Sequence, residues 1–137
     1  MQRKILFLCT GNSCRSQMAE GWLKQLGGDR FAVYSAGIEA HGKSPRAIAV
    51  MQESGVDISG QQSELLQSDM LEQLDLLVTV CGHADRFCPV LPVTCRKEHW
   101  PFDDPAKASG SEDEIMAEFR RVRDQIHMRV ERFVAQG

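Results

Sequence analysis

The sequence lacks the features that direct a protein into or across a membrane. Its longest apolar run, Leu74–Val80, is interrupted by Asp75 and is far shorter than the roughly 20 residues that span a bilayer. Near the start, the charged pair Arg3 and Lys4 is followed by only about five apolar residues before Thr10, too few for the apolar core of a secretion signal. These absences predict a cytoplasmic protein that binds no membrane.

The chain also lacks a surplus of basic residues, internal repeats and linker-like stretches. It carries 16 Lys and Arg against 19 Asp and Glu, a net charge of −3. Proteins that bind duplex DNA normally carry a basic surplus, so we expect no nucleic-acid partner. With 137 residues, 42% of them hydrophobic and 26% charged, the chain predicts one globular domain over residues 1–137.

Cysteine, in contrast, is abundant. There are five cysteines, an odd number in a chain without a visible export signal: Cys9, Cys14, Cys81, Cys88 and Cys95. Structural disulfides are disfavoured in a reducing cytosol. The thiols are therefore core filler, metal ligands or reactive groups.

The hydrophobic pattern alternates between strands and helices. Predicted strands cover residues 4–9, 31–35, 75–80 and 93–100, and predicted helices cover 15–26, 45–51, 69–73 and 115–133, with residues 81–88 a short helix or a loop. Ser44 and the pair Ser111 and Glu114 are expected caps. This order predicts an α/β fold, a four-stranded parallel sheet with helices on both faces. Ligands of such sheets bind beyond the carboxyl ends of the strands, where Cys9 and Cys81 both lie.

The segment from Cys9 to Ser16 has the form C-x5-R-S and lies between a predicted strand and a predicted helix. Backbone N–H groups of such a turn, together with the helix N-terminus, attract an anion. Arg15 can hold two oxygens of a tetrahedral oxyanion. The same positive field favours the Cys9 thiolate, a nucleophile, and Ser16 is placed to donate to it. The alternative is an incidental turn with a buried Cys9; for Cys14 we favour a small filler.

The remaining cysteines, Cys81, Cys88 and Cys95, are spaced seven residues apart. On a helix, residues 81 and 88 face the same way but rise about 10.5 Å apart. A disulfide needs Cα atoms roughly 4.4–6.8 Å apart, so bonding the two requires unwinding. A zinc site with His83 or His99 is the alternative, but zinc ligand pairs are normally two to four residues apart. Cys95 is expected to be passive packing.

Two adjacent carboxylates, Asp103 and Asp104, follow the last predicted strand and precede Pro105. If a thiolate attacks an oxyanion, the leaving oxygen needs a proton, which a carboxylic acid supplies. Both cannot point into one anion pocket without repulsion. One is expected to be the acid, and the residues alone do not say which. Asp-Pro is also common in turns without any function.

Four segments together resemble the thioredoxin-coupled arsenate reductases, which share the low-molecular-weight protein tyrosine phosphatase fold. The segments are Leu8–Glu20, Tyr34–Gly37, Thr79–Gly82 with Cys88-Pro89, and His99–Ala106. The resemblance covers essentially the whole chain. The C-x5-R-S loop is shared with the phosphatases, whereas the pair Cys81 and Cys88 is specific to the reductases.

The resemblance implies an enzyme of arsenic detoxification. Cys9 would attack arsenate, Asp104 would protonate the leaving oxygen, and Cys81 would then displace arsenite from Cys9. Cys88 would move the disulfide to positions 81 and 88, where thioredoxin, the electron donor, reduces it. The oxyanion would be held by Thr10, Gly11, Asn12, Ser13, Cys14, Arg15 and Ser16, and phosphate or sulfate would compete for this loop. We expect a monomer.

We expect no tightly bound cofactor and no transition metal. Members of this family can bind a potassium ion, which here would lie near Asn12, Glu20, Ser35 and Glu64; the family usually has Asp at the last position.

Two other functions compete. A tyrosine phosphatase usually has two aromatic residues after the Asp-Pro pair, where this chain has Ala106-Lys107-Ala108, so at most weak side activity is expected. The other is a non-catalytic thiol or zinc sensor.

Overall fold

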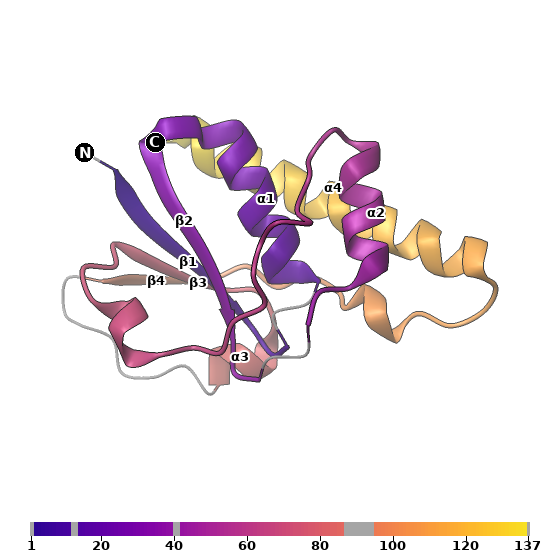
Figure 1. Cartoon of the computed structure of the whole chain (residues 1–137), viewed down its shortest axis with the longest axis horizontal. Coiled ribbons are helices and arrows are strands. Elements are labelled where there is room, and N and C mark those ends of the chain that lie inside the picture. Colours follow the sequence, from indigo (N-terminus) through magenta and orange to yellow (C-terminus); the bar gives the residue numbers. More distant parts are fainter. Residues whose placement is uncertain (1, 12–13, 40–41, 87–94, 137) are drawn as a thin grey trace.

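The computed structural model describes residues 2–11, 14–39, 42–86 and 95–136 (Figure 1). The strands are β1 (Arg3–Cys9), β2 (Phe31–Gly37), β3 (Leu76–Thr79) and β4 (Arg96–His99). The α-helices are α1 (Arg15–Gly27), α2 (Pro45–Glu53), α3 (Gly82–Arg86) and α4 (Glu112–Gln136). Short 3-10 helices are η1 (Gly28–Arg30), η2 (Ser68–Leu71) and η3 (Pro105–Lys107).

The four strands form one parallel sheet in the order β2-β1-β3-β4. At the carboxyl end of β1, Leu8 pairs with Thr79 of β3 and Cys9 pairs with Gly37 of β2. The carboxyl ends therefore meet at one edge of the sheet. The predicted α/β fold with a four-stranded parallel sheet is confirmed.

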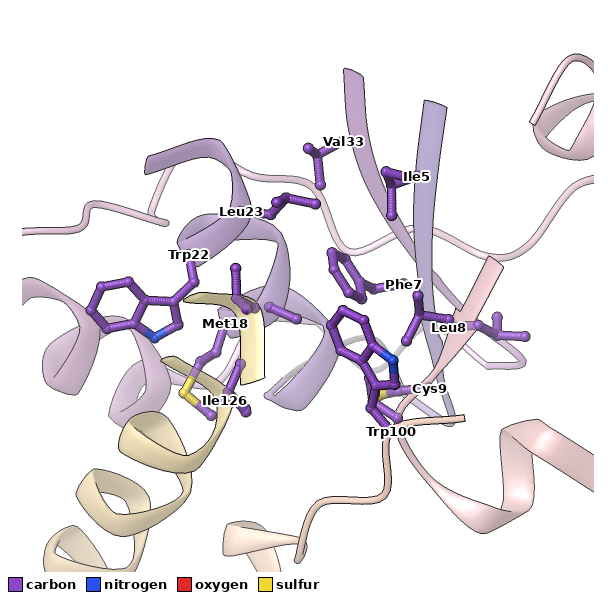
Figure 2. Close-up of a cluster of buried hydrophobic side chains, with 14 of the residues drawn as sticks. Ile5, Phe7, Leu8, Cys9, Met18, Trp22, Leu23, Val33, Trp100 and Ile126 are labelled. Carbon is purple, nitrogen blue, oxygen red and sulfur yellow. The ribbon is translucent and has the colours of Figure 1, made fainter. Parts of the chain in front are cut away.

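The central strand β1 is buried on both faces. Ile5, Leu6, Phe7 and Leu8 have no exposed surface, although successive side chains of a strand point to opposite faces. Helices α1, α2 and α4 pack together on one side (Figure 1). Phe7 lies on that side, with its ring 5.6 Å from the ring of Trp100 (Figure 2).

Both expected helix starts are formed as the sequence indicates. The Ser44 side chain accepts a hydrogen bond from Ala47 N at 3.3 Å at the start of α2. Ser111 and Glu114 bond reciprocally before α4, each at 3.2 Å. These bonds satisfy backbone N–H groups that have no partner within the helix. The buried face of α4 follows the predicted helical spacing: Phe119, Val122, Ile126, Val130 and Phe133.

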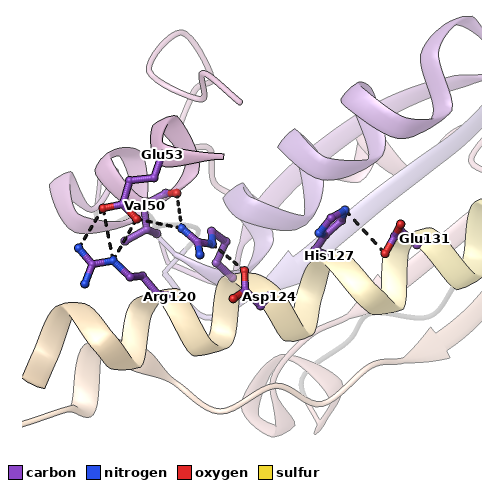
Figure 3. Close-up of polar contacts among 7 residues, drawn as sticks. Val50, Glu53, Arg120, Asp124, His127 and Glu131 are labelled. Atoms are coloured by element: carbon purple, nitrogen blue, oxygen red, sulfur yellow. Dashed lines mark hydrogen bonds and ion pairs between the residues drawn. The ribbon is translucent and has the colours of Figure 1, made fainter. Parts of the chain in front are cut away.

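Polar contacts fix α2 against α4 (Figure 3), and a ring stack fixes α1 against α4. Glu53 of α2 binds Arg120 through both carboxylate oxygens, and Arg123 donates to the carbonyl of Val50 at 2.9 Å. Trp22 of α1 stacks on His127, with ring centroids 3.8 Å apart. Helices α1 and α2, from the first half of the chain, are thereby joined to α4, the last helix, in one layer.

Most elements differ from the expected boundaries by one to three residues at an end; α4, for example, covers Glu112–Gln136 where 115–133 was expected. Strand β2 continues to Gly37, and the expected helix over 69–73 is the 3-10 helix η2. Strand β4 covers only Arg96–His99 of the expected 93–100, and Trp100, which follows it, is buried; residues 93 and 94 lie outside the described ranges. Within the described residues, no helix is both long enough and apolar enough to cross a membrane.

Shortening a core side chain of α4 tests this packing. Ile126 is fully buried, so Ile126→Ala should lower the free energy of unfolding by about 2–5 kcal/mol. Met128→Ala, at a residue that is 62% exposed on the same helix, is the matched control and should change it by less than about 0.5 kcal/mol. Chemical denaturation measures both. Equal effects would contradict the orientation of α4.

Candidate active site

Two cysteine thiols meet at the carboxyl edge of the sheet. Cys9 ends β1, and Cys81 follows β3, the neighbouring parallel strand. Their side chains are joined by a hydrogen bond, and both are buried, with 4% and 6% of their surfaces exposed. The structure thus brings together the two thiols that the sequence placed at this edge.

The surroundings of Cys81 favour its thiolate. The hydrogen bond from Cys9 is the main cause, and it lowers the pKa of Cys81 to about 4 against the opposing effect of burial. Thr10 Oγ1 lies 3.3 Å from Cys81 Sγ, and Ala84 N donates to it at 3.4 Å. The positive charge of Arg15 also lowers the pKa of Cys81. From the sequence we expected the negative charge only on Cys9. Because a hydrogen bond joins the two thiols, either sulfur can carry that charge.

A small cavity lies in front of Cys9, one of the two thiols. Its volume is about 180 Å³, and the residues that line it are Cys9, Thr10, Gly11, Cys14, Arg15, Asp104 and Ala106. Arg15 is the first residue of α1, so the cavity opens at a helix N-terminus, which attracts anions. This arrangement suits a small oxyanion held next to a nucleophilic sulfur.

Arg15 connects this cavity to the loop that carries the two carboxylates. Its Nη1 donates to the carbonyl of Phe102 at 3.0 Å, and its Nη2 lies 3.6 Å from Asp104 Oδ2. The Arg15 side chain is only 12% exposed. The guanidinium is therefore held in place before any ligand binds.

The structure separates the two carboxylates that the residues alone left equivalent. Asp103 is 71% exposed and binds Arg121 of α4 at 3.0 Å, away from the cavity. Asp104 lines the cavity, and its Oδ1 accepts from Ala106 N at 3.0 Å, which caps η3. Asp104 is thus the carboxylate that can reach a bound oxyanion.

The other predicted site residues are placed as follows. Ser16 is fully buried in the first turn of α1, and Cys14 is buried directly before that helix. Cys95 is half-buried and donates to the carbonyl of Arg96. Asn12, Ser13 and Cys88 lie outside the described residues. Among the described residues, no group of three or more His, Cys, Asp or Glu could hold a metal ion.

The expected potassium position is already next to a cation. Glu20, Ser35 and Glu64 line one cavity, while Asn12 is not described. The buried carboxylate of Glu20 accepts from Ser35 Oγ on one oxygen and contacts Lys24 Nζ with the other. Because Lys24 supplies the positive charge there, the described residues do not fit a potassium ion unless Lys24 moves.

The family model described as "Low molecular weight phosphotyrosine protein phosphatase" matches residues 4–136. The chain belongs to this family.

Among curated proteins, an arsenate reductase of Bacillus subtilis (strain 168) is 56% identical over 138 residues, covering 100% of this chain and 99% of that protein. An arsenate reductase of Staphylococcus aureus (strain N315) is 54% identical over 132 residues, covering 96% of each. A solved structure described as an arsenate reductase in the phosphate binding state has a TM-score of 0.80 and 41% identity, covering 98% of both chains. The resemblance found in the sequence is confirmed.

Sequence reasoning missed one polar network beside the thiols of this phosphatase-family chain. Thr79, Asp85, Lys97 and His99 contact one another where β3 and β4 end. Thr79 ends β3 and His99 ends β4, and these two places at strand ends could have signalled it. Sequence reasoning also missed the contact of Thr10 with Cys81, for which spacing gave no signal.

The lowered pKa of Cys81 predicts how its reactivity depends on pH. Because the folded-state pKa is below the ordinary value, the thiolate predominates above a pH of about 4 and is lost below it. Alkylation by iodoacetamide, resolved at Cys81 by peptide mass spectrometry, should follow this midpoint. Free cysteine, with a pKa of about 8.5, is the reference. A midpoint near that reference would contradict the described hydrogen bonds.

Proposed function

We propose that this protein reduces arsenate to arsenite with three cysteines acting in turn, the last disulfide being reduced by thioredoxin. One observation carries the proposal: a second thiol, Cys81, lies within hydrogen-bond reach of the nucleophile Cys9 at an anion cavity. A phosphatase needs only the first. The naming of full-length curated relatives as arsenate reductases supports this choice.

The oxyanion is attracted by positive charge around the cavity. The N-terminus of α1 and the guanidinium of Arg15 attract the oxyanion, and Arg15 holds two of its oxygens. We expect the loop N–H groups from Thr10 to Ser16 to add further bonds. Because arsenate, phosphate and sulfate are all tetrahedral, phosphate and sulfate should compete. The solved arsenate reductase described in a phosphate binding state supports this expectation.

In the first chemical step, the proton that Cys9 shares with Cys81 passes to Cys81, and the Cys9 thiolate attacks arsenic. A sulfur–arsenic bond forms and one arsenic–oxygen bond breaks. Asp104, on the cavity wall, protonates the departing oxygen, which leaves as water. Arg15 offsets the negative charge throughout.

The redox step follows at the same two sulfurs. Cys81 loses its proton to the departing arsenic oxyanion and attacks Cys9 Sγ. The sulfur–arsenic bond breaks, its electron pair stays with arsenic, and arsenic(V) leaves as arsenite(III). A Cys9–Cys81 disulfide is formed. The hydrogen bond between these thiols means that little movement is needed for this step.

Cys88 completes the relay. Its thiolate attacks Cys81, Cys9 leaves as a thiolate, and the disulfide now joins positions 81 and 88. Thioredoxin then reduces that disulfide by the same exchange chemistry. A monomeric, cytoplasmic enzyme fits this partner, because the cytosol keeps thiols reduced.

The role of Asp104 is tested against its neighbour. Asp104→Asn keeps an oxygen that can cap η3 but cannot donate a proton as an acid does, so arsenate reduction should fall by about 10²–10⁴-fold. Asp103→Asn, the matched control, removes only an exposed ion pair and should stay within about threefold. Steady-state reduction rates measure both. A larger loss at Asp103 would contradict the assignment.

The relay is tested by NADPH consumption with arsenate, thioredoxin and thioredoxin reductase. The parent should consume NADPH continuously, whereas Cys88→Ser should stop after one turnover, because its Cys9–Cys81 disulfide cannot move outward. Cys95→Ser removes a thiol outside the relay and should behave as the parent.

A different result identifies a rival function. Hydrolysis of an aryl phosphate without arsenate-dependent NADPH use would make the protein a phosphatase. Stoichiometric zinc in the purified protein without turnover would make it a sensor. In the described structure, the cavity is walled by Ala106 after Pro105 and not by an aromatic ring, which disfavours an aryl substrate.

A further inference from the structure

A second cavity borders the loop that carries Asp104. Its volume is about 310 Å³, against about 180 Å³ for the cavity at Cys9. Pro101, Phe102 and Asp103 line it from the loop, and side chains of α4 line it from the other side. The two cavities have no described lining residue in common. The same loop therefore borders two separate cavities.

Two arginines of α4 give this second cavity positive charge. Arg129 and Arg132 both line it, and because they are three residues apart they share one face of the helix. Arg132 is exposed and, within the described part of the chain, its guanidinium is in no ion pair. The carboxylate of Asp103, on the loop, is already paired with Arg121 at 3.0 Å. The cavity therefore favours a ligand with negative charge.

The guanidinium of Arg129 is only partly satisfied by its present contacts. It lies 4.1 Å from the ring centre of Trp100, and its Nη2 donates to Glu98 Oε1 at 3.4 Å. The same Glu98 oxygen also accepts from Trp100 Nε1 at 2.9 Å. Arg129 Nη1 is buried and has no hydrogen-bond partner among the described residues, although buried donors are normally bonded. A small turn of this side chain toward the cavity would let a ligand oxygen supply the missing bond.

The rest of the cavity suits an apolar group. Met128 is 62% exposed, although its side chain is large and apolar, and it lines the cavity together with Pro101 and Phe102. An apolar ligand group that covered Met128 would remove this surface from water, which is favourable. Gln125 adds an amide that can donate or accept a hydrogen bond. Apolar walls with a few polar groups are typical of sites for small molecules.

We propose that this cavity binds a small organic carboxylate with an apolar body. Arg129 and Arg132 hold the carboxylate, and Met128 and Phe102 cover the apolar body. A carboxylate suits this position because its two oxygens can accept parallel hydrogen bonds from one planar guanidinium. The site is separate from the cavity at Cys9, so the inference does not depend on the three-cysteine relay.

The test is a titration of the whole protein with 3-phenylpropionate, followed by two-dimensional NMR of ¹⁵N-labelled protein in phosphate buffer. Phosphate competes for the anion loop at Cys9 and so suppresses binding of the probe there. Amide signals of residues 101–103 and 125–132 should shift, with a Kd on the order of 1 mM for a ligand of this size. Acetate lacks the apolar body and 3-phenylpropanol lacks the charge, so each should bind at least about tenfold more weakly.

Variants identify the groups that hold the carboxylate. Arg132→Gln removes a charge from an exposed position and should weaken binding of 3-phenylpropionate by about tenfold. Arg30→Gln, the same change at an exposed arginine of η1, is the matched control and should leave the Kd unchanged. Arg129→Gln is an independent variant that should also weaken binding, and its NMR spectrum shows whether it keeps the parent fold.

Four results would overturn the proposal. If acetate binds as tightly as 3-phenylpropionate, the cavity holds an adventitious ion only; if 3-phenylpropanol does, the arginines have no role. Shifts confined to residues 9–16 would place the probe in the other cavity. Shifts of the signals of residues 101–103 and 125–132 with protein concentration, in the absence of probe, would assign this face to a second copy of the chain.

Discussion

The pairing of β1 with β3 is the constraint on which the site depends. Because the two strands are parallel neighbours, their carboxyl ends place Cys9 and Cys81 side by side, 72 residues apart in sequence and joined by a hydrogen bond. A thiol pair of this kind can share one proton and later one covalent bond. Burial keeps water away from both sulfurs, so the charge on the pair responds to Thr10 and Arg15.

The loop that carries Asp104, the proposed acid, is positioned by the long final helix. Arg121 of α4 holds Asp103, and the guanidinium of Arg129 lies 4.1 Å from the ring centre of Trp100. The loop between them is fixed at both ends. Asp104 is consequently presented to the cavity while its neighbour faces solvent. The helical layer therefore helps to place the proposed acid as well as forming part of the core.

Much of this could be predicted from the sequence, because local patterns carry it. The apolar run before Cys9, the C-x5-R-S spacing and the periodicity of α4 each specify an element, and parallel order then aligns the strand ends. The sequence could not separate Asp103 from Asp104 on residue type, since the difference arises from a contact with Arg121, 18 residues away. The Asp85 network depends likewise on pairing between β3 and β4. Cys88, the last member of the proposed relay, lies outside the described residues.

The central claim is that arsenate is reduced by electrons from this chain's own thiols. The most direct measurement is the number of free thiols per chain after arsenate is added to reduced enzyme without thioredoxin. We expect two thiols to be lost, with the disulfide mapped to positions 81 and 88. An unchanged thiol count with arsenate bound would contradict it.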